Sequence, residues 1–186
     1  LANISVKDPK GHIRSAGRGG LGAVMGSKKI KFITLDDNDG AGIEIGDKDR
    51  FKAAALIFNK GLLSHPVSGE ALPKYGTDVL VNIINESGSL PTKNFRYGQF
   101  DGAEKISGET MYDTIMSRNG DPTHGCHVGC VIRCSQTYND KEGKYLTSGF
   151  EYETIWGFGA GCTIDDLDVI AEIDHACDDI GIDTIE

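Results

Sequence analysis

Apolar residues recur at every third or fourth position along several stretches of the chain, which is the spacing of one face of an α-helix. The pattern is strongest near the end of the sequence, where we expect Thr163 to be the N-cap of a helix over residues 164–180. Further helices are expected over residues 49–63, 75–86 and 109–118. The chain beyond residue 40 is therefore predicted to be largely helical.

Polar residues and glycines mark where these helices should start and stop. Thr77 and Ser107 are the expected N-caps of the two middle helices, because a hydroxyl oxygen can accept a hydrogen bond from a free amide of the first turn. Asp166 lies three residues after the expected cap of the last helix and completes a capping-box pattern. Gly88 and Gly120 are end signals, and Pro66 should stop the first helix.

Short runs of β-branched and alternating residues predict strands rather than helices. One pair is expected around a Pro–Lys–Gly turn and another around the polar turn at 139–144, with a single further strand before the acidic turn at 36–40. The expected strands are residues 4–6, 12–14, 30–35, 135–138 and 145–147. Because strands and helices occupy separate parts of the chain, the fold class is α+β, with a domain boundary at the acidic turn.

Composition excludes several classes of function. The formal net charge of −9 argues against nucleic acid as the main partner, because phosphate binding needs a basic face. No apolar run approaches the roughly 20 residues that span a bilayer, so no membrane segment is expected. The first residues lack the charged head and apolar run of a signal peptide. The chain also begins with Leu1, and we expect it to be a piece of a longer polypeptide.

The densest candidate chemistry is a group of three cysteines, Cys126, Cys130 and Cys134, within nine residues. Soft thiolate ligands suit iron–sulfur clusters and zinc. The cysteine count of the chain is five, and an odd, clustered set fits a disulfide framework poorly. A reducing, cytoplasmic setting is therefore expected.

Three thiolates leave one ligand of a four-coordinate site to be found. Zinc would recruit His124 or His127, although the spacing matches no common zinc knuckle. An iron–sulfur cluster would take its fourth ligand from Cys162, from Cys177 or from outside the chain. The remaining alternative is that the thiols are buried and inert.

A glycine-rich stretch at residues 17–28 contains two basic residues, Arg18 and Lys28. Its spacing matches neither the dinucleotide-binding fingerprint nor the Walker A loop. Glycine backbone next to cations can cradle an anion or a phosphate. A tight turn between strands explains the glycines equally well, and both interpretations remain open.

Acidic residues gather at an unfavourable end of the last predicted helix. Asp174, Asp178 and Asp179 lie toward its C-terminus, where the helix dipole opposes each exposed carboxylate by roughly 0.3–1 kcal/mol. These carboxylates either accept hydrogen bonds from a donor outside the chain or form a solvated acidic surface.

A second acidic pair, Glu151 and Glu153, flanks Tyr152. In an extended segment both carboxylates would point to one side. One of them could then act as a general acid or base in a pocket. Two exposed glutamates on a surface strand are the alternative.

Taken together, these blocks resemble the aldehyde ferredoxin oxidoreductase family, whose members are tungsten- or molybdenum-pterin enzymes. The resemblance rests on residues 16–28, on the cysteine group, and on residues 149–154 continuing through 165–167 to 178–183. It implies that residues 1–37 end a β-rich platform domain for a bis-pterin metal cofactor. Residues 38–186 would then begin the first of two largely helical domains, and the third domain would lie outside this chain.

The resemblance also implies roles for the cysteines. Cys126, Cys130 and Cys134 match three ligands of a [4Fe–4S] cluster, and the fourth family cysteine would lie beyond Glu186. The family spacing is C-x2-C-x3-C, whereas the first gap in this chain is one residue longer.

The cofactor-binding positions follow by the same comparison. Asp178 and Asp183 match the family's D-x-x-G-(L/I)-D motif, which hydrogen-bonds one pterin. Arg18, Gly19 and Gly20 match the segment that contacts the cofactor phosphates and a bridging Mg²⁺.

The function implied is the oxidation of an aldehyde with water to a carboxylic acid, with Glu153 matching the acidic residue near the metal that activates water or relays a proton. Electrons would pass through the pterin and the cluster to ferredoxin. The partners implied are thus ferredoxin and a small aldehyde, and self-association into a homo-oligomer stays open. The alternative is a non-catalytic iron–sulfur or zinc module that serves electron transfer or structure.

Overall fold

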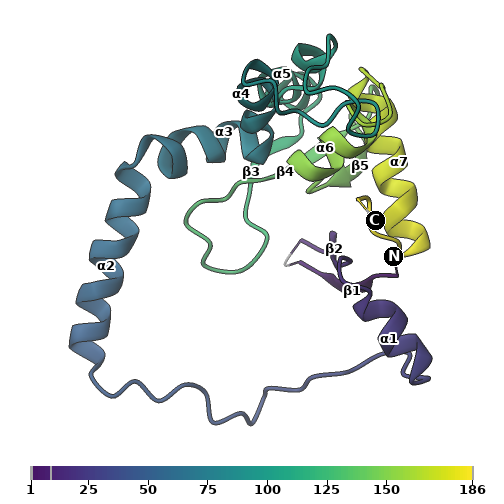
Figure 1. Cartoon of the computed structure of the whole chain (residues 1–186). Coiled ribbons are helices and arrows are strands. Elements are labelled where there is room, and N and C mark those ends of the chain that lie inside the picture. The colour runs from purple at the N-terminus through teal and green to yellow at the C-terminus, as the bar shows by residue number, and fades with distance from the viewer. Residues whose placement is uncertain (1, 9, 186) are drawn as a thin grey trace.

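Two small antiparallel sheets and a series of helices make up residues 2–8 and 10–185, the parts of the chain that the computed structural model describes (Figure 1). The first sheet is the hairpin of β1 (Ile4–Lys7) and β2 (Ile13–Ala16), and the second has the order β3 (Asp121–His124), β4 (Ser135–Asn139), β5 (Tyr145–Ser148). The α-helices are α1 (Leu21–Ser27), α2 (Lys48–Ser64), α3 (Leu72–Tyr75), α4 (Leu80–Glu86), α5 (Gly108–Ser117), α6 (Tyr152–Phe158) and α7 (Leu167–Ile180). Shorter turns are the π-helix η1 (Pro66–Ala71) and the 3₁₀ turns η2 (Gly76–Val79) and η3 (Ala103–Ile106). The α+β class predicted from the sequence is confirmed.

The hydrophobic core lies where α4 to α7 cover the second sheet. Its fully buried large side chains come from both helices and strands, and include Met111, Ile115, Tyr138, Phe150 and Ile170. The apolar face predicted for the last helix packs inward over most of α7, but Ile180 at its end is 70% exposed and Asp174 is buried among the apolar residues. The spacing of apolar residues in the sequence therefore determines which side of α7 packs against the core.

The hairpin β1–β2 docks against the end of α7, far from it in sequence. The Asn3 amide donates to the Gly181 carbonyl oxygen at 2.8 Å, and Ala2 pairs with Ile182. Gly22 makes the approach of α1 possible, because a methyl group there would lie 2.1 Å from the Ala2 carbonyl oxygen. The first residues of the chain thus meet the last ones, as Figure 1 shows.

The segment between α1 and α2 is extended and makes few contacts, and the strand expected over residues 30–35 is absent. The residues are apolar enough for a strand, and Leu35 is 90% exposed. A strand needs a neighbour for its backbone hydrogen bonds, and the described residues supply none to this segment.

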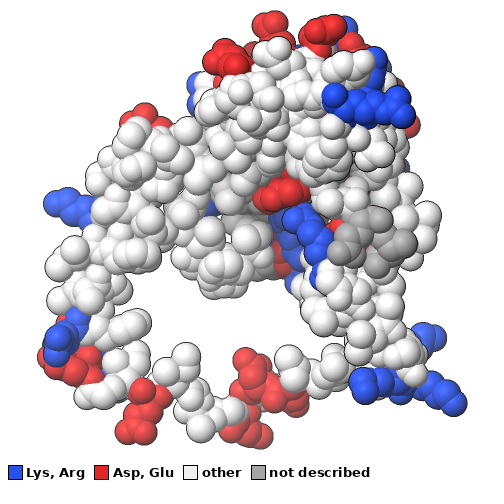
Figure 2. All heavy atoms as spheres, viewed as in Figure 1, with Lys and Arg blue, Asp and Glu red and all other residues white. Residues whose placement is uncertain are grey.

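Helix α2 continues this exposed arm (Figure 1), and much of its surface is uncharged (Figure 2). It has no buried residue along its 17 positions. It is also the longest of the described helices, and no helix in these ranges has the length and apolar character needed to cross a bilayer.

Several predicted elements agree with the structure. Ser107 caps α5, since its hydroxyl accepts a hydrogen bond from the Thr110 amide at 3.3 Å. Helix α2 covers the predicted 49–63 and stops before Pro66. The hairpin of β1 and β2 and the hairpin around residues 139–144 both form, although Pro9 of the first expected turn lies outside the described residues. Strand β3 was not predicted from the sequence.

The start of the last helix was predicted wrongly. Thr163 has a left-handed backbone (φ 63°) and does not cap α7. Asp166 is the N-cap instead, and its carboxylate accepts from the amides of Asp168 and Val169. A carboxylate is as good a cap as a hydroxyl, so the helix begins at Leu167, three residues later than expected.

The prediction for residues 75–86 was only partly correct, because a 3₁₀ turn precedes α4 and Thr77 caps neither. Its hydroxyl instead accepts from the Tyr152 amide at 3.0 Å, at the start of α6. The segment around Tyr152 is itself helical rather than extended. Glu151 and Glu153 therefore lie at the beginning of a helix and not on a strand.

A matched pair of isoleucines on α7 tests this account of the core. Ile170 is fully buried, whereas Ile180 on the same helix is 70% exposed. We expect Ile170→Ala to lower the free energy of unfolding by about 2–5 kcal/mol because it leaves a cavity. Ile180→Ala should change it by less than about 0.5 kcal/mol. Urea unfolding measures both, and equal losses would contradict the assignment of the buried face.

Candidate functional site

Three of the site residues predicted from the sequence come together in the structure, although they lie in three different segments. The guanidinium group of Arg18 stands between two carboxylates, with its Nε 3.6 Å from Asp183 Oδ1 and its Nη1 3.9 Å from Glu153 Oε1. Arg18 follows β2, Glu153 is in the first turn of α6, and Asp183 follows α7. The grouping brings one cation and two anions to a common surface.

Glycines allow this close approach. A methyl group at Gly17 would lie 2.4 Å from Asp183 Oδ1, so only glycine lets the chain pass there. Gly19 and Gly20 have left-handed backbones, with φ of 85° and 70°, and a methyl group on either would meet open space. The two peptides next to Arg18 thus leave room for a ligand against the backbone.

A polar cavity of about 210 Å³ lies beside this group. Its lining includes Asn3, Arg14, Arg18, Asp178 and Asp183. Guanidinium groups bind phosphate oxygens well, and carboxylates accept hydrogen bonds from N–H donors. The lining can therefore bind anionic groups, such as phosphate, through its arginines and N–H donors through its aspartates.

Burial changes the charge state of the helix-end acids that the sequence singled out. Burial raises the pKa of Asp174 to about 7, while a hydrogen bond from Thr147 Oγ1 at 2.5 Å works in the opposite direction. Burial also raises the pKa of Asp178, with His175 and Arg14 opposing the shift. Asp174 and Asp178 therefore bind a proton more readily than a solvated aspartate does.

Cys126, Cys130 and Cys134 lie in the loop between β3 and β4, which projects into the opening of the molecule (Figure 1). Each is half-buried. Burial raises the pKa of the Cys134 thiol, and the charges of Glu151 and the other two cysteines add to the effect. The Arg133 amide points at Cys130 Sγ from 3.4 Å, the kind of N–H contact that tunes cluster sulfurs.

The arrangement of this loop bears on which metal it could hold. In the described part of the chain, these cysteines do not form a set of ligand atoms within 4.8 Å of one another. Zinc would need its sulfurs about 3.8 Å apart, given Zn–S bonds of about 2.3 Å. A [4Fe–4S] cube is a larger body and takes one thiolate at each corner. At least one pair of these sulfurs is therefore farther apart than a single zinc ion requires.

The neighbouring histidines do not complete the cysteine site. His127 is exposed, and its Nδ1 lies 2.8 Å from the Val128 carbonyl oxygen. His124 points away and binds Asp8. Among the other cysteines, Cys162 is exposed and Cys177 is buried on α7.

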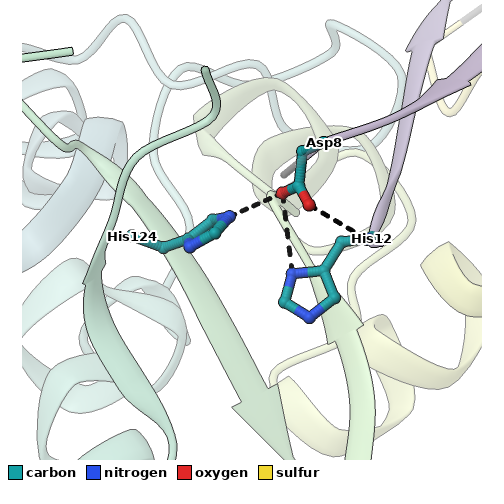
Figure 3. A group of neighbouring side chains, drawn as sticks. All are labelled: Asp8, His12 and His124. Atoms are coloured by element: carbon teal, nitrogen blue, oxygen red, sulfur yellow. Dashed lines mark hydrogen bonds and ion pairs between the residues drawn. The ribbon is translucent and has the colours of Figure 1, made fainter. Parts of the chain in front are cut away.

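A group that sequence analysis missed joins the hairpin to the second sheet (Figure 3). His124 Nε2 lies 2.6 Å from Asp8 Oδ2, and His12 Nδ1 lies 3.7 Å from the same oxygen. Arg14 Nη2 approaches that oxygen to 3.6 Å. The residues are separated by up to 116 positions in the sequence, so no local pattern could have revealed them.

Asp8 is ionised despite its burial. Burial acts to raise its pKa, but hydrogen bonds from His124 and from the His12 and Lys10 amides outweigh it and hold the pKa at about 2. The His124–Asp8 contact comes immediately before the cysteine loop. It therefore fixes the position of that loop relative to the hairpin.

Comparison with known proteins gives two family matches that together cover most of the chain. Residues 53–186 match the family described as aldehyde ferredoxin oxidoreductase, domains 2 and 3, and residues 1–37 match its N-terminal domain. The chain is 45% identical over 175 residues to the tungsten-containing aldehyde ferredoxin oxidoreductase of Thermococcus kodakarensis. It is 44% identical over 176 residues to the protein of that name from Pyrococcus furiosus. Each match covers 94% of this chain but only 27% of the relative's length.

The Asp8–His124 contact can be tested by its dependence on pH. We expect Asp8→Asn to lower the free energy of unfolding by about 1–3 kcal/mol near neutral pH, because His124 loses a charged acceptor inside the protein. The pKa of Asp8 falls from 3.8 to about 2 on folding. The contribution is therefore present above about pH 4 and is lost as the pH falls toward 2.

Urea unfolding of both proteins at about pH 7 and about pH 3 measures this difference. Asp39→Asn, in the exposed connector, is the control and should have little effect at either pH. A gap between wild type and Asp8→Asn that stays constant with pH would contradict the assignment.

Proposed function

Because the chain belongs to the aldehyde ferredoxin oxidoreductase family, we propose that it is part of an enzyme that oxidises aldehydes to carboxylic acids. The observation that carries this proposal is the meeting of Arg18 with Glu153 and Asp183, beside a polar cavity that Arg18 and Asp183 line. The chain spans 27% of the length of the relatives that it matches. The activity, the substrate and the partners are therefore proposed for the whole protein that contains it.

The cavity is proposed to hold a tungsten–pterin cofactor, the metal being the one named for the two relatives. Asp178 and Asp183 would accept hydrogen bonds from the pterin, and Arg18 would bind the phosphate oxygens of a cofactor that also carries Mg²⁺. The space beside Gly19 and Gly20, where a methyl group would meet no other atom, supports this placement because a phosphate could come close to the chain there.

Once bound, the metal–pterin group would supply the two-electron oxidation itself. The part that falls to this chain is proton handling at Glu153. Its carboxylate would accept a proton from the water that attacks the aldehyde carbon, with the Arg18 guanidinium group 3.9 Å away. The overall change is aldehyde plus water to carboxylic acid, with two electrons and two protons released.

The cysteine loop is proposed to hold the [4Fe–4S] cluster through Cys126, Cys130 and Cys134. Its fourth ligand would come from a part of the protein outside this chain. The two electrons would leave through this cluster one at a time and reduce ferredoxin.

The same proposal divides the chain into two regions. Residues 1–37 would end the β-rich platform domain and residues 38–186 would begin the helical domain. A reducing, cytoplasmic environment suits the five free cysteines.

The cluster assignment can be tested with two cysteines of the chain. In the full-length protein purified without oxygen, Cys130→Ser should remove most of the reduced-cluster EPR signal and lower the iron content. Cys162 is exposed and lies outside the loop, so Cys162→Ser should keep both. A cluster signal that survives Cys130→Ser unchanged would exclude this residue as a ligand.

The cofactor assignment is tested at the aspartate that approaches Arg18. Asp183→Asn removes a charged acceptor, a loss worth about 1.5–3 kcal/mol, so retention of the cofactor should weaken roughly tenfold or more. Tungsten content and pterin fluorescence after denaturation measure this. Asp165→Asn, which removes an exposed partner of Lys105, is the control. If Asp183→Asn and Asp178→Asn together leave metal content and activity intact, the protein is better explained as an iron–sulfur module.

A further inference from the structure

Arg14 is a cation that the proposed mechanism does not use, although it reaches both the polar cavity and the cysteine loop. It lies in β2, and its side chain is 19% exposed. The residue lines the cavity together with Arg18. Its Nη2 also donates a hydrogen bond to Ser135 Oγ at 2.6 Å. Ser135 directly follows Cys134, so one side chain touches the wall of the cavity and the end of the loop.

The hairpin β1–β2 holds the cysteine loop at both of its ends. The loop leaves the second sheet at His124, the last residue of β3, and returns at Ser135, the first residue of β4. These two residues are paired across the two strands. Asp8 Oδ2 lies 2.6 Å from His124 Nε2 (Figure 3), and Arg14 bonds Ser135. The three cysteines therefore lie on a loop whose two ends are fixed by one hairpin.

A glycine makes room for the contact between Arg14 and Ser135. A methyl group at Gly149 would lie 2.0 Å from Arg14 Nη1 and 3.4 Å from Ser135 Oγ. The φ angle of Gly149 is 73°, a value that glycine adopts without strain. Ser135 itself is 1% exposed. The guanidinium group thus passes close to the backbone and bonds a hydroxyl group that solvent does not reach.

The charge of Asp8 does not require Arg14. Arg14 Nη2 lies 3.6 Å from Asp8 Oδ2, whereas His124 is 1 Å closer to that oxygen. The other oxygen of Asp8 accepts from the amides of Lys10 and His12. The carboxylate therefore has nearer partners, and the guanidinium group can serve a second anion.

One donor of Arg14 also lacks an acceptor. Its Nε is buried and has no hydrogen-bond partner among residues 2–8 and 10–185. Buried donors are almost always paired, so this N–H group fits an acceptor that comes from outside the chain. In the described ranges, Arg14 and Arg18 are the basic residues of the cavity lining. Because guanidinium groups bind phosphate oxygens in pairs of hydrogen bonds, two of them in one cavity can share a single anionic group.

We propose that Arg14 is a positioning residue that ties the cysteine loop to the cofactor cavity. This inference rests on the proposed function, in which the cavity holds the cofactor and the loop holds the cluster. The guanidinium group holds Ser135, and through it the position of Cys134, while its remaining donors bind an anionic group of the cofactor. Loss of this one side chain disturbs two metal sites that separate segments of the chain provide.

The first arm of the test removes the hydrogen bond to the loop from either side and does not depend on activity. In the full-length protein purified without oxygen, Ser135→Ala should change the g-values of the reduced-cluster EPR signal and keep the tungsten content. Arg14→Gln should change the signal too. The double variant should match Arg14→Gln, because both substitutions remove the same contact. An unchanged signal in Ser135→Ala, or a double variant that shows the sum of the two changes, overturns the proposal.

The second arm measures cofactor retention. Arg14→Gln should lower tungsten content and pterin fluorescence after denaturation roughly tenfold, because a charged donor to the cofactor is lost. Arg118→Gln is the matched control: Arg118 is 16% exposed and pairs with a carboxylate, but it lies outside both sites. That variant should keep both the cofactor and the EPR signal. Equal losses in the two arginine variants would indicate general destabilisation and overturn the proposal.

The two arms separate this inference from the proposed function. If the wild type holds a cluster but neither tungsten nor pterin, the proposed function fails, and the EPR arm alone decides whether Arg14 positions Cys134. If the wild type holds no cluster either, both proposals are overturned.

Discussion

The packing of residues 2–18 against the ends of α6 and α7 is the contact on which the candidate site depends. Without it Arg18 would not face Glu153 and Asp183, and the polar cavity would lose one wall. The contact is built from backbone pairing at Gly181, from a glycine at position 17 that admits the Asp183 side chain, and from the buried charge of Asp8. Each part has a different physical origin, and together they hold a surface segment in one position.

The surroundings of two buried aspartates shift their pKa values in opposite directions. Asp8 keeps its charge, since His124 and two backbone amides bond its oxygens. Asp78 has no such partners and two acidic neighbours, and it is driven toward the neutral form. The environment rather than the residue type therefore decides which carboxyl groups carry charge and which carry protons.

The local features of the fold could be predicted from the sequence, and the long-range contacts could not. The apolar spacing of α7, the Ser107 cap and the polar hairpin turn act within a few residues, so the pattern alone specified them. The expected strand at 30–35 failed because pairing depends on a partner that the described chain does not provide.

For the site, resemblance selected Arg18, Glu153 and Asp183, and the structure brings these three together. The Asp8–His124 contact and the burial of Asp78 had no sequence signal. Each depends on which distant segments of the chain fold over the residue. The residue type alone does not determine whether the carboxyl group is charged.

The exposed connector between α1 and α2 has a consequence for how the protein tolerates change. It links the hairpin to the helical body covalently, but the contacts that hold the two together are made elsewhere, at Gly181 and at His124. The connector therefore acts as a tether. Lengthening it costs loop entropy, which lowers the free energy of unfolding by about 0.6 kcal/mol for each doubling of its length. Insertions there should be nearly neutral for the candidate site, so that evolution can vary this segment while the cavity stays the same.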